Sequence, residues 1–106
     1  MRYLSNYFVP DIRASVFVGP NIMRIGIEKP TFITLKSRPT PQQVNALHIL
    51  GEYPNRLVPK FDLCDRLGVT KSSLAVHICR LRGRLTDDWT IESRHGCFRL
   101  IDLRGK

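Results

Sequence analysis

Residues 71–85 carry the most distinctive chemical pattern of the chain, because cationic and small side chains gather there with no acid among them. Cationic side chains bind phosphate oxygens, and an arginine such as Arg80 can donate two parallel hydrogen bonds to one guanine. The hydroxyl groups of Ser72 and Ser73 suit phosphates, and Val76 offers an apolar contact to a thymine methyl group. These residue types favour a surface that lies against DNA.

The spacing of the apolar residues in this segment predicts an amphipathic helix, because side chains three or four residues apart share one face. The stripe expected to pack on the core comprises Leu74, Ile78, Leu81 and Leu85. The outward face comprises Ser72, Ser73, Val76, Cys79, Arg80 and Gly83, with His77 and Arg84 on one flank and Ala75 and Arg82 on the other. An ordinary solvated face usually holds Glu and Lys four residues apart, and this face has none.

The same pattern has a less specific interpretation, which is a basic surface helix that attracts any polyanion weakly. Gly83 does not separate the two, since a glycine costs a helix about 1 kcal/mol and can simply mark its end. We expect Arg80 and Val76 to contact base edges. Ser72 and Ser73 should contact phosphates near the helix N-terminus, where the helix dipole favours anions.

A first helix is predicted upstream, because Thr40, Pro41 and Gln43 form a capping box with proline at the first helical position. One face of this helix carries Val44, Leu47 and Leu50. Pro54 should end it, since the residue before a proline avoids the helical region. This helix would supply part of the core on which residues 71–85 pack.

A second helix is predicted over residues 59–68, with a glycine as its stop, and Thr70 then caps the third. After the third helix, two apolar runs at residues 89–93 and 97–101 flank Arg94-His95-Gly96. That pattern predicts a β-hairpin with a basic tip. Three helices followed by a hairpin is the order of a winged helix, so the expected fold class is α+β.

The N-terminal third is predicted to form a small antiparallel sheet. Its three strands should span residues 15–18, 22–28 and 32–35, with turns at Gly19-Pro20-Asn21 and Lys29-Pro30. One face of such a sheet is apolar and must be covered by a later element of the chain. Residues 1–14 are open to two interpretations, an extra strand or a docking arm. We therefore expect one compact domain, with residues 1–38 as arm and sheet and residues 39–106 as the winged helix-turn-helix.

Two stretches also resemble known families. The sequence LCDRLGVTKSSLAVHICRL, from Leu63, resembles the general helix-turn-helix pattern. The longer set TPQQVNALHIL, PNRLVPKFDL, SLAVHICRLRGRL and IESRHGCFRL is similar to the DNA-binding effector domain of OmpR/PhoB-type response regulators. The resemblance implies that Val76 and Arg80 contact bases, that Ser73, His77 and Arg82 contact phosphates, and that Arg94 enters the minor groove. The full expected sets are Val76, Arg80 and Arg94 for bases, and Lys71, Ser72, Ser73, His77, Arg82 and Arg84 for phosphates.

The chain also departs from that family. Only Gly68-Val69-Thr70 separates the second and third helices, whereas the family usually has a longer loop there that touches RNA polymerase. Cys79 stands where a basic residue is common, and Gly96-Cys97-Phe98 replaces a Gly-x-Gly-Tyr arrangement. The chain has no room for a receiver domain. Activation through that loop and control by phosphorelay are therefore not expected.

The composition limits the remaining classes of function. Seventeen Lys and Arg against nine Asp and Glu give a net charge of +8 in 106 residues, which suits a polyanionic partner. Cys64, Cys79 and Cys97 lie too far apart for the close pairs of a zinc site and are interpreted as packing residues in a reducing compartment. Neither a signal peptide nor a membrane span is predicted. No cofactor and no enzymatic activity are expected, because His48, His77 and His95 fall on separate elements without a nucleophile.

The sequence thus predicts a cytoplasmic, nucleoid-associated transcriptional regulator that binds specific double-stranded DNA and acts mainly by occupying its site. A homodimer or tandem copies on repeated half-sites are expected, because one small domain covers little DNA. The alternative is a winged-helix interaction module that binds an acidic regulator or an RNA polymerase surface. Salt dependence separates the two, because DNA binding releases counterions.

Overall fold

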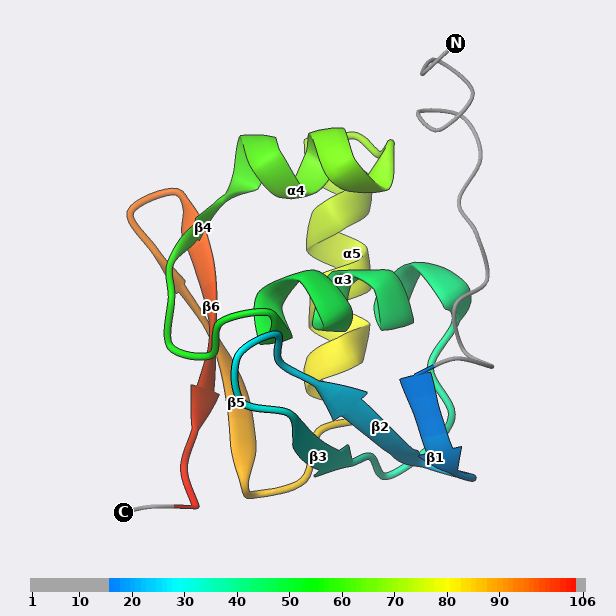
Figure 1. Ribbon diagram of the computed structural model, residues 1–106. Helices are drawn as coiled ribbons and strands as arrows, with labels where there is room; N and C mark the ends of the chain where they lie inside the picture. The colour runs from blue at the N-terminus through cyan, green and yellow to red at the C-terminus, as the bar shows by residue number, and fades with distance from the viewer. Residues whose placement is uncertain (1–15, 105–106) are drawn as a thin grey trace, which may run out of the picture.

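The computed structural model describes residues 16–104 and has an α+β architecture, with three helices and two three-stranded antiparallel sheets in that part of the chain (Figure 1). The elements in chain order are β1 (Phe17–Gly19), β2 (Ile22–Ile25), β3 (Thr31–Thr34), α3 (Pro41–Gly51), β4 (Val58–Pro59), α4 (Lys60–Leu67), α5 (Lys71–Arg82), β5 (Trp89–Arg94) and β6 (Cys97–Asp102). The expected fold class is confirmed at this level. The predicted arm at residues 1–14 lies outside the described residues.

The first sheet has the order β1-β2-β3, and its inner face is covered by α3 (Figure 1). Met23 and Ile33 face each other across β2 and β3 and are fully buried. The contact with α3 is close: a Cβ atom at Gly51 would lie 2.8 Å from Cβ of Ile25. The strand β2 ends at Ile25, earlier than predicted, because Gly26 takes a φ of +98° that breaks the extended backbone.

The helix starts agree with the predicted caps. The Thr40 hydroxyl accepts the backbone N–H of Gln43 at 3.3 Å, and the Gln43 side chain accepts the backbone N–H of Thr40 at 3.2 Å. Thr70 caps α5 through a single bond, since its hydroxyl accepts the backbone N–H of Ser73 at 3.2 Å. The helix α5 is shorter than predicted and ends at Arg82. Beyond that end, Leu85 forms a β-bridge with Leu35.

The second sheet has the order β4-β6-β5, and its two-residue strand β4 was not predicted. Pro59 pairs with Cys97 there, so α4 begins one residue later than expected, at Lys60. The β5–β6 hairpin is confirmed, but its turn is the pair His95-Gly96, with φ values of 50° and 74°. A two-residue loop with positive φ at both positions is typical of a type I′ hairpin turn, and Arg94 is therefore the last residue of β5.

The core lies between α3, the buried face of α5 and the inner faces of the sheets (Figure 1). The predicted stripe is confirmed, because Leu74, Ile78 and Leu81 of α5 are at most 1% exposed and Leu85, just beyond the helix, is 4% exposed. The helix α3 buries more than its predicted face, with Ala46 and Ile49 also inside. Among residues 16–104, no helix is long and apolar enough to cross a membrane.

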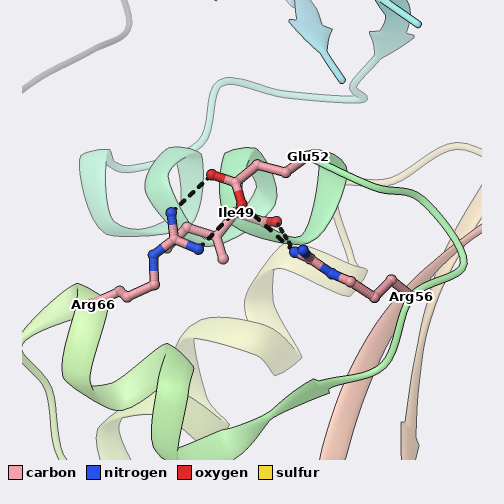
Figure 2. Close-up of polar contacts among 4 residues, drawn as sticks. All are labelled: Ile49, Glu52, Arg56 and Arg66. Atoms are coloured by element: carbon pink, nitrogen blue, oxygen red, sulfur yellow. Dashed lines mark hydrogen bonds and ion pairs between the residues drawn. The ribbon is translucent and has the colours of Figure 1, made fainter. Parts of the chain in front are cut away.

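Glu52, at the C-terminal end of α3, joins that helix to α4. Figure 2 shows Arg66 and Arg56 approaching its carboxylate from opposite sides. Arg66 of α4 donates two hydrogen bonds to it, at 3.1 and 2.8 Å, and Arg56 lies 3.6 Å away while donating to the carbonyl of Ile49 at 3.2 Å. The hydrogen bonds from Arg66 lower the pKa of Glu52 against the opposing effect of burial.

Glu52→Gln should lower the free energy of unfolding at pH 7, because it removes the ion pair with Arg66. The loss should be only about 1 kcal/mol, since Arg66 is half-exposed and solvent screens the pair. The carboxylate stabilises the fold above the ordinary pKa of 4.5, and that contribution is lost as the pH falls through the lowered folded-state pKa. Urea unfolding at pH 7 and pH 3 should show the difference from the parent shrinking in acid. Glu28→Gln, at an exposed position, is the control. If Glu52→Gln lost the same unfolding free energy at pH 7 and at pH 3, the stabilising role of the Glu52 carboxylate would be contradicted.

Candidate nucleic-acid interface

The outward face of α5 is the surface on which the predicted site residues gather. All six residues assigned to it are exposed, namely Ser72, Ser73, Val76, Cys79, Arg80 and Gly83. Val76 keeps 45% of its surface accessible and so offers an apolar contact on this face. The predicted orientation of this helix is therefore confirmed, and its exposed side carries no acidic residue.

The position of α5 depends on a short connection and on contacts at both of its ends. Gly68 takes the left-handed conformation, with φ 69° and ψ 36°, and closes α4 so that α5 begins three residues later, as predicted. From there α5 runs behind α3 toward the first sheet (Figure 1). Ser72 lies at the start of this run, with its hydroxyl 3.3 Å from that of Thr70. The turn thus orients the first residues of the exposed face.

Lys71 is placed by an aromatic ring at the same end of α5. Its ammonium group lies 4.3 Å from the ring centroid of Phe61, a residue of α4 that is 69% exposed. A cation over an aromatic face is attracted to it. This contact holds a positive charge at a helix N-terminus, where the helix dipole alone would disfavour it.

The hairpin tip brings a second group of basic residues into the candidate site. Arg94 and His95 are exposed there. The backbone N–H of Lys60 donates to the carbonyl of Gly96 at 3.0 Å, so the start of α4 lies directly beside the turn. The Lys60 ammonium group lies 5.2 Å from the ring centroid of Phe98. Sequence reasoning missed Lys60, because only the pairing of β4 with β6 places it next to the tip.

Arg82 joins the end of α5 to the hairpin. Its Nε donates to the carbonyl of Ile91 in β5 at 2.9 Å, and its guanidinium carbon lies 6.0 Å from the ring centroid of Phe98. The residue itself remains exposed. Arg82 therefore sets the position of the hairpin relative to α5, a role that the sequence pattern did not indicate.

Arg84 has its partners within the fold, although it was predicted to contact phosphate. Its Nε donates to Oε1 of Gln43 at 2.8 Å, and its Nη1 donates to the hydroxyl of Ser37 at 2.6 Å. Gln43 is 1% exposed, and a buried amide oxygen left without a partner would be costly. Arg84 thus binds α5 to the start of α3, and it does not belong to the proposed interface.

The cysteines and histidines do not assemble a chemical centre in the described part of the chain. No group of three or more His, Cys, Asp or Glu residues in it could hold a metal ion. Cys64 packs against the core, but Cys79 is exposed on α5, so its interpretation as a packing residue is wrong. His48 is partly buried in α3 as expected, and His77 is half-exposed on the flank of α5.

Acidic residues lie elsewhere. Glu28, Glu52 and Asp102 line a pocket of about 300 Å³ between the β2–β3 loop, the end of α3 and the end of β6. The hairpin acid Glu92 is paired with Arg99 on the neighbouring strand. Three acids therefore surround a separate pocket, two more, Asp62 and Asp65, are exposed on α4, and the exposed face of α5 itself carries none. Comparisons of the chain with protein-family models, curated proteins and solved structures found no match.

Proposed function

We propose that the chain binds specific double-stranded DNA as a winged helix, with α5 in the major groove and the β5–β6 hairpin as the wing. The observation that carries this proposal is the acid-free exposed face of α5, with Val76 and Arg80 on it and cations from α4 and the hairpin beside it. The order of three helices and a hairpin agrees with such an arrangement. Its resemblance to OmpR/PhoB-type effector domains rests on the sequence pattern.

The size of α5 suits the groove. Its twelve residues span about 18 Å at 1.5 Å each, whereas the major groove is about 12 Å wide. Residues on its exposed face can then contact base edges, and residues at its ends and along its flanks can contact the phosphates on both sides. We assign Arg80 and Val76 to bases and Arg94 to the minor groove. The phosphate contacts comprise Lys60, Lys71, Ser72, Ser73, His77 and Arg82.

The biological role that suits this binding is transcriptional regulation by occupancy of a site. The connection between α4 and α5 is only three residues long, which leaves little surface there for a polymerase contact. A single domain of this size buries a limited DNA surface, so tight specific binding requires a homodimer or tandem copies. A mobility-shift titration on one and on two selected half-sites measures this: cooperative binding to two half-sites is the expected result.

A selection from random duplexes followed by a salt titration tests the central proposal. A defined sequence should be enriched, and the logarithm of the binding constant should fall linearly with the logarithm of salt concentration. The proposed phosphate contacts of Lys60, Lys71 and Arg82 predict a slope of about −2.7 or steeper, since each neutralised phosphate contributes about −0.9. Failure to enrich any sequence would overturn sequence-specific binding.

Cys79 offers a direct probe of the interface, because it is exposed on α5 whereas Cys64 is half-buried on α4. The selected duplex should protect Cys79 from N-ethylmaleimide, since a helix lying in the groove is covered by DNA. Site-resolved mass spectrometry measures labelling with and without duplex, and Cys64 is the internal control. If Cys79 were labelled at the same rate with saturating duplex as without it, α5 would lie outside the interface.

A protein partner is the second candidate, favoured by the exposed apolar residues Phe61 and Val76. Such a module would bind an acidic regulator or a polymerase surface through the same face of α5. It predicts no enriched duplex sequence, so the selection experiment separates it from the first proposal.

A further inference from the structure

Residues 36–38, which connect β3 to α3, are held against the C-terminal end of α5. The backbone N–H of Lys36 donates to the carbonyl of Arg84 at 2.7 Å, and Leu35 bridges Leu85 just before it. The Arg84 side chain donates to the Ser37 hydroxyl at 2.6 Å, while its Nε is bound to buried Gln43. Backbone and side-chain contacts therefore determine together where this connection lies relative to α5.

The connection presents positive charge. Lys36 and Arg38 are exposed, and the sequence from Lys29 to Gly51 contains no acidic residue. Neither cation forms an ion pair with an acid of residues 16–104. Arg38 is nevertheless oriented, since its guanidinium lies 5.2 Å from the Phe17 ring centroid and donates to the carbonyl of Pro20 at 3.3 Å. An oriented cation loses less conformational entropy when it binds an anion.

The two ends of α5 are thus both basic. Lys71 stands at the N-terminal end, and the connection with Lys36 and Arg38 lies beside the C-terminal end. About 18 Å of helix separates these ends, which exceeds the width of the major groove. A helix placed across that groove brings its two ends to the two opposite phosphate backbones.

We infer that Lys36 and Arg38 form a second phosphate-binding surface, on the DNA strand opposite to the one contacted at Lys71, and that Arg84 positions it. This inference rests on the proposed function. Sequence reasoning did not identify the surface, because residues 36–38 precede the helices and only the contacts with Arg84 place them beside α5.

The test is a salt titration of the double variant Lys36→Ala/Arg38→Ala on the duplex that the parent selects. The slope of log K against log salt should become shallower by about 1.8, since each phosphate contact contributes about 0.9. The base preferences should not change, because phosphate contacts carry no sequence information. Arg24→Ala/Lys29→Ala is the matched control: it removes the same charge from exposed positions on β2 and on the β2–β3 loop, and its slope should stay close to that of the parent.

Lys36→Gln alone covers the case in which the loss of Arg38 from the Phe17 ring disturbs the fold. It retains the backbone bond to Arg84, and its slope should be shallower by about 0.9. The second phosphate-binding surface alone would be overturned if the parent bound with a steep slope, Lys36→Gln had the same slope as the parent, and the double variant had the same slope as its control. A parent that binds no duplex would overturn the proposed function as well.

Discussion

Leu81→Ala should lower the free energy of unfolding by about 2–5 kcal/mol, because Leu81 is fully buried where α5 faces the core. The truncated side chain removes apolar burial and leaves a cavity that its neighbours fill only in part. A loss of this size is a large fraction of the roughly 5–15 kcal/mol typical of a whole domain. Urea unfolding followed by fluorescence measures it, since Trp89 is the only tryptophan of the chain and is 3% exposed.

Val76→Ala is the matched control for this experiment, because it truncates an apolar residue on the opposite side of the same helix. Its effect on unfolding should stay within about 0.5 kcal/mol, as for most surface substitutions. Binding to the selected duplex should nevertheless weaken in Val76→Ala, since a contact with a base would be lost. Equal destabilisation by both substitutions would mean that the buried and exposed faces of α5 are assigned incorrectly.

Arg80→Ala should weaken binding to the selected duplex by about 1–3 kcal/mol, which is the usual contribution of a bidentate arginine–guanine contact. The preference at one base pair should relax, while preferences at the other positions are retained. Arg80 is exposed on α5, so its removal should leave unfolding nearly unchanged. Fluorescence anisotropy with duplexes that carry each of the four base pairs at every position measures both effects.

Arg82→Ala provides the contrast within the same turn of helix. Because Arg82 carries a charge toward phosphates and also holds the hairpin through Ile91, its loss should weaken all duplexes alike. If Arg80→Ala also weakened binding to all duplexes alike, without a change in base preference, Arg80 would contact the DNA phosphates and not the bases.

Local patterns were sufficient to predict several parts of the fold. The capping box at Thr40 formed as expected, because the bonds that it requires lie within four residues. The buried stripe of α5 followed from its helical period. Gly68 ended α4 because glycine readily adopts the left-handed conformation that closes a helix. In each case the determining interactions are close in sequence, so the residue types alone contain the information.

Other parts depended on long-range contacts. The strand β4 is two residues long and carries no pattern of its own, so only its pairing with β6 defines it. The hydrogen-bond partners of Arg84 lie 41 and 47 residues away in the sequence. The sequence pattern could not reveal these bonds, so it predicted a phosphate contact where the side chain instead supports the connection between β3 and α3. Lys60 and Lys36 entered the proposed interface for the same reason.

The sequence by itself determined the character of the surface proposed to bind DNA, since the absence of acids from residues 71–85 and the period of the apolar residues are properties of the chain alone. It also determined which side of α5 turns outward, because burial of the apolar stripe leaves one orientation. The tertiary structure alone decided which other cations lie beside that helix. Hydrogen bonds between distant backbone segments place Lys36 and Lys60, and such pairings depend on the packed core and leave no local trace in the sequence.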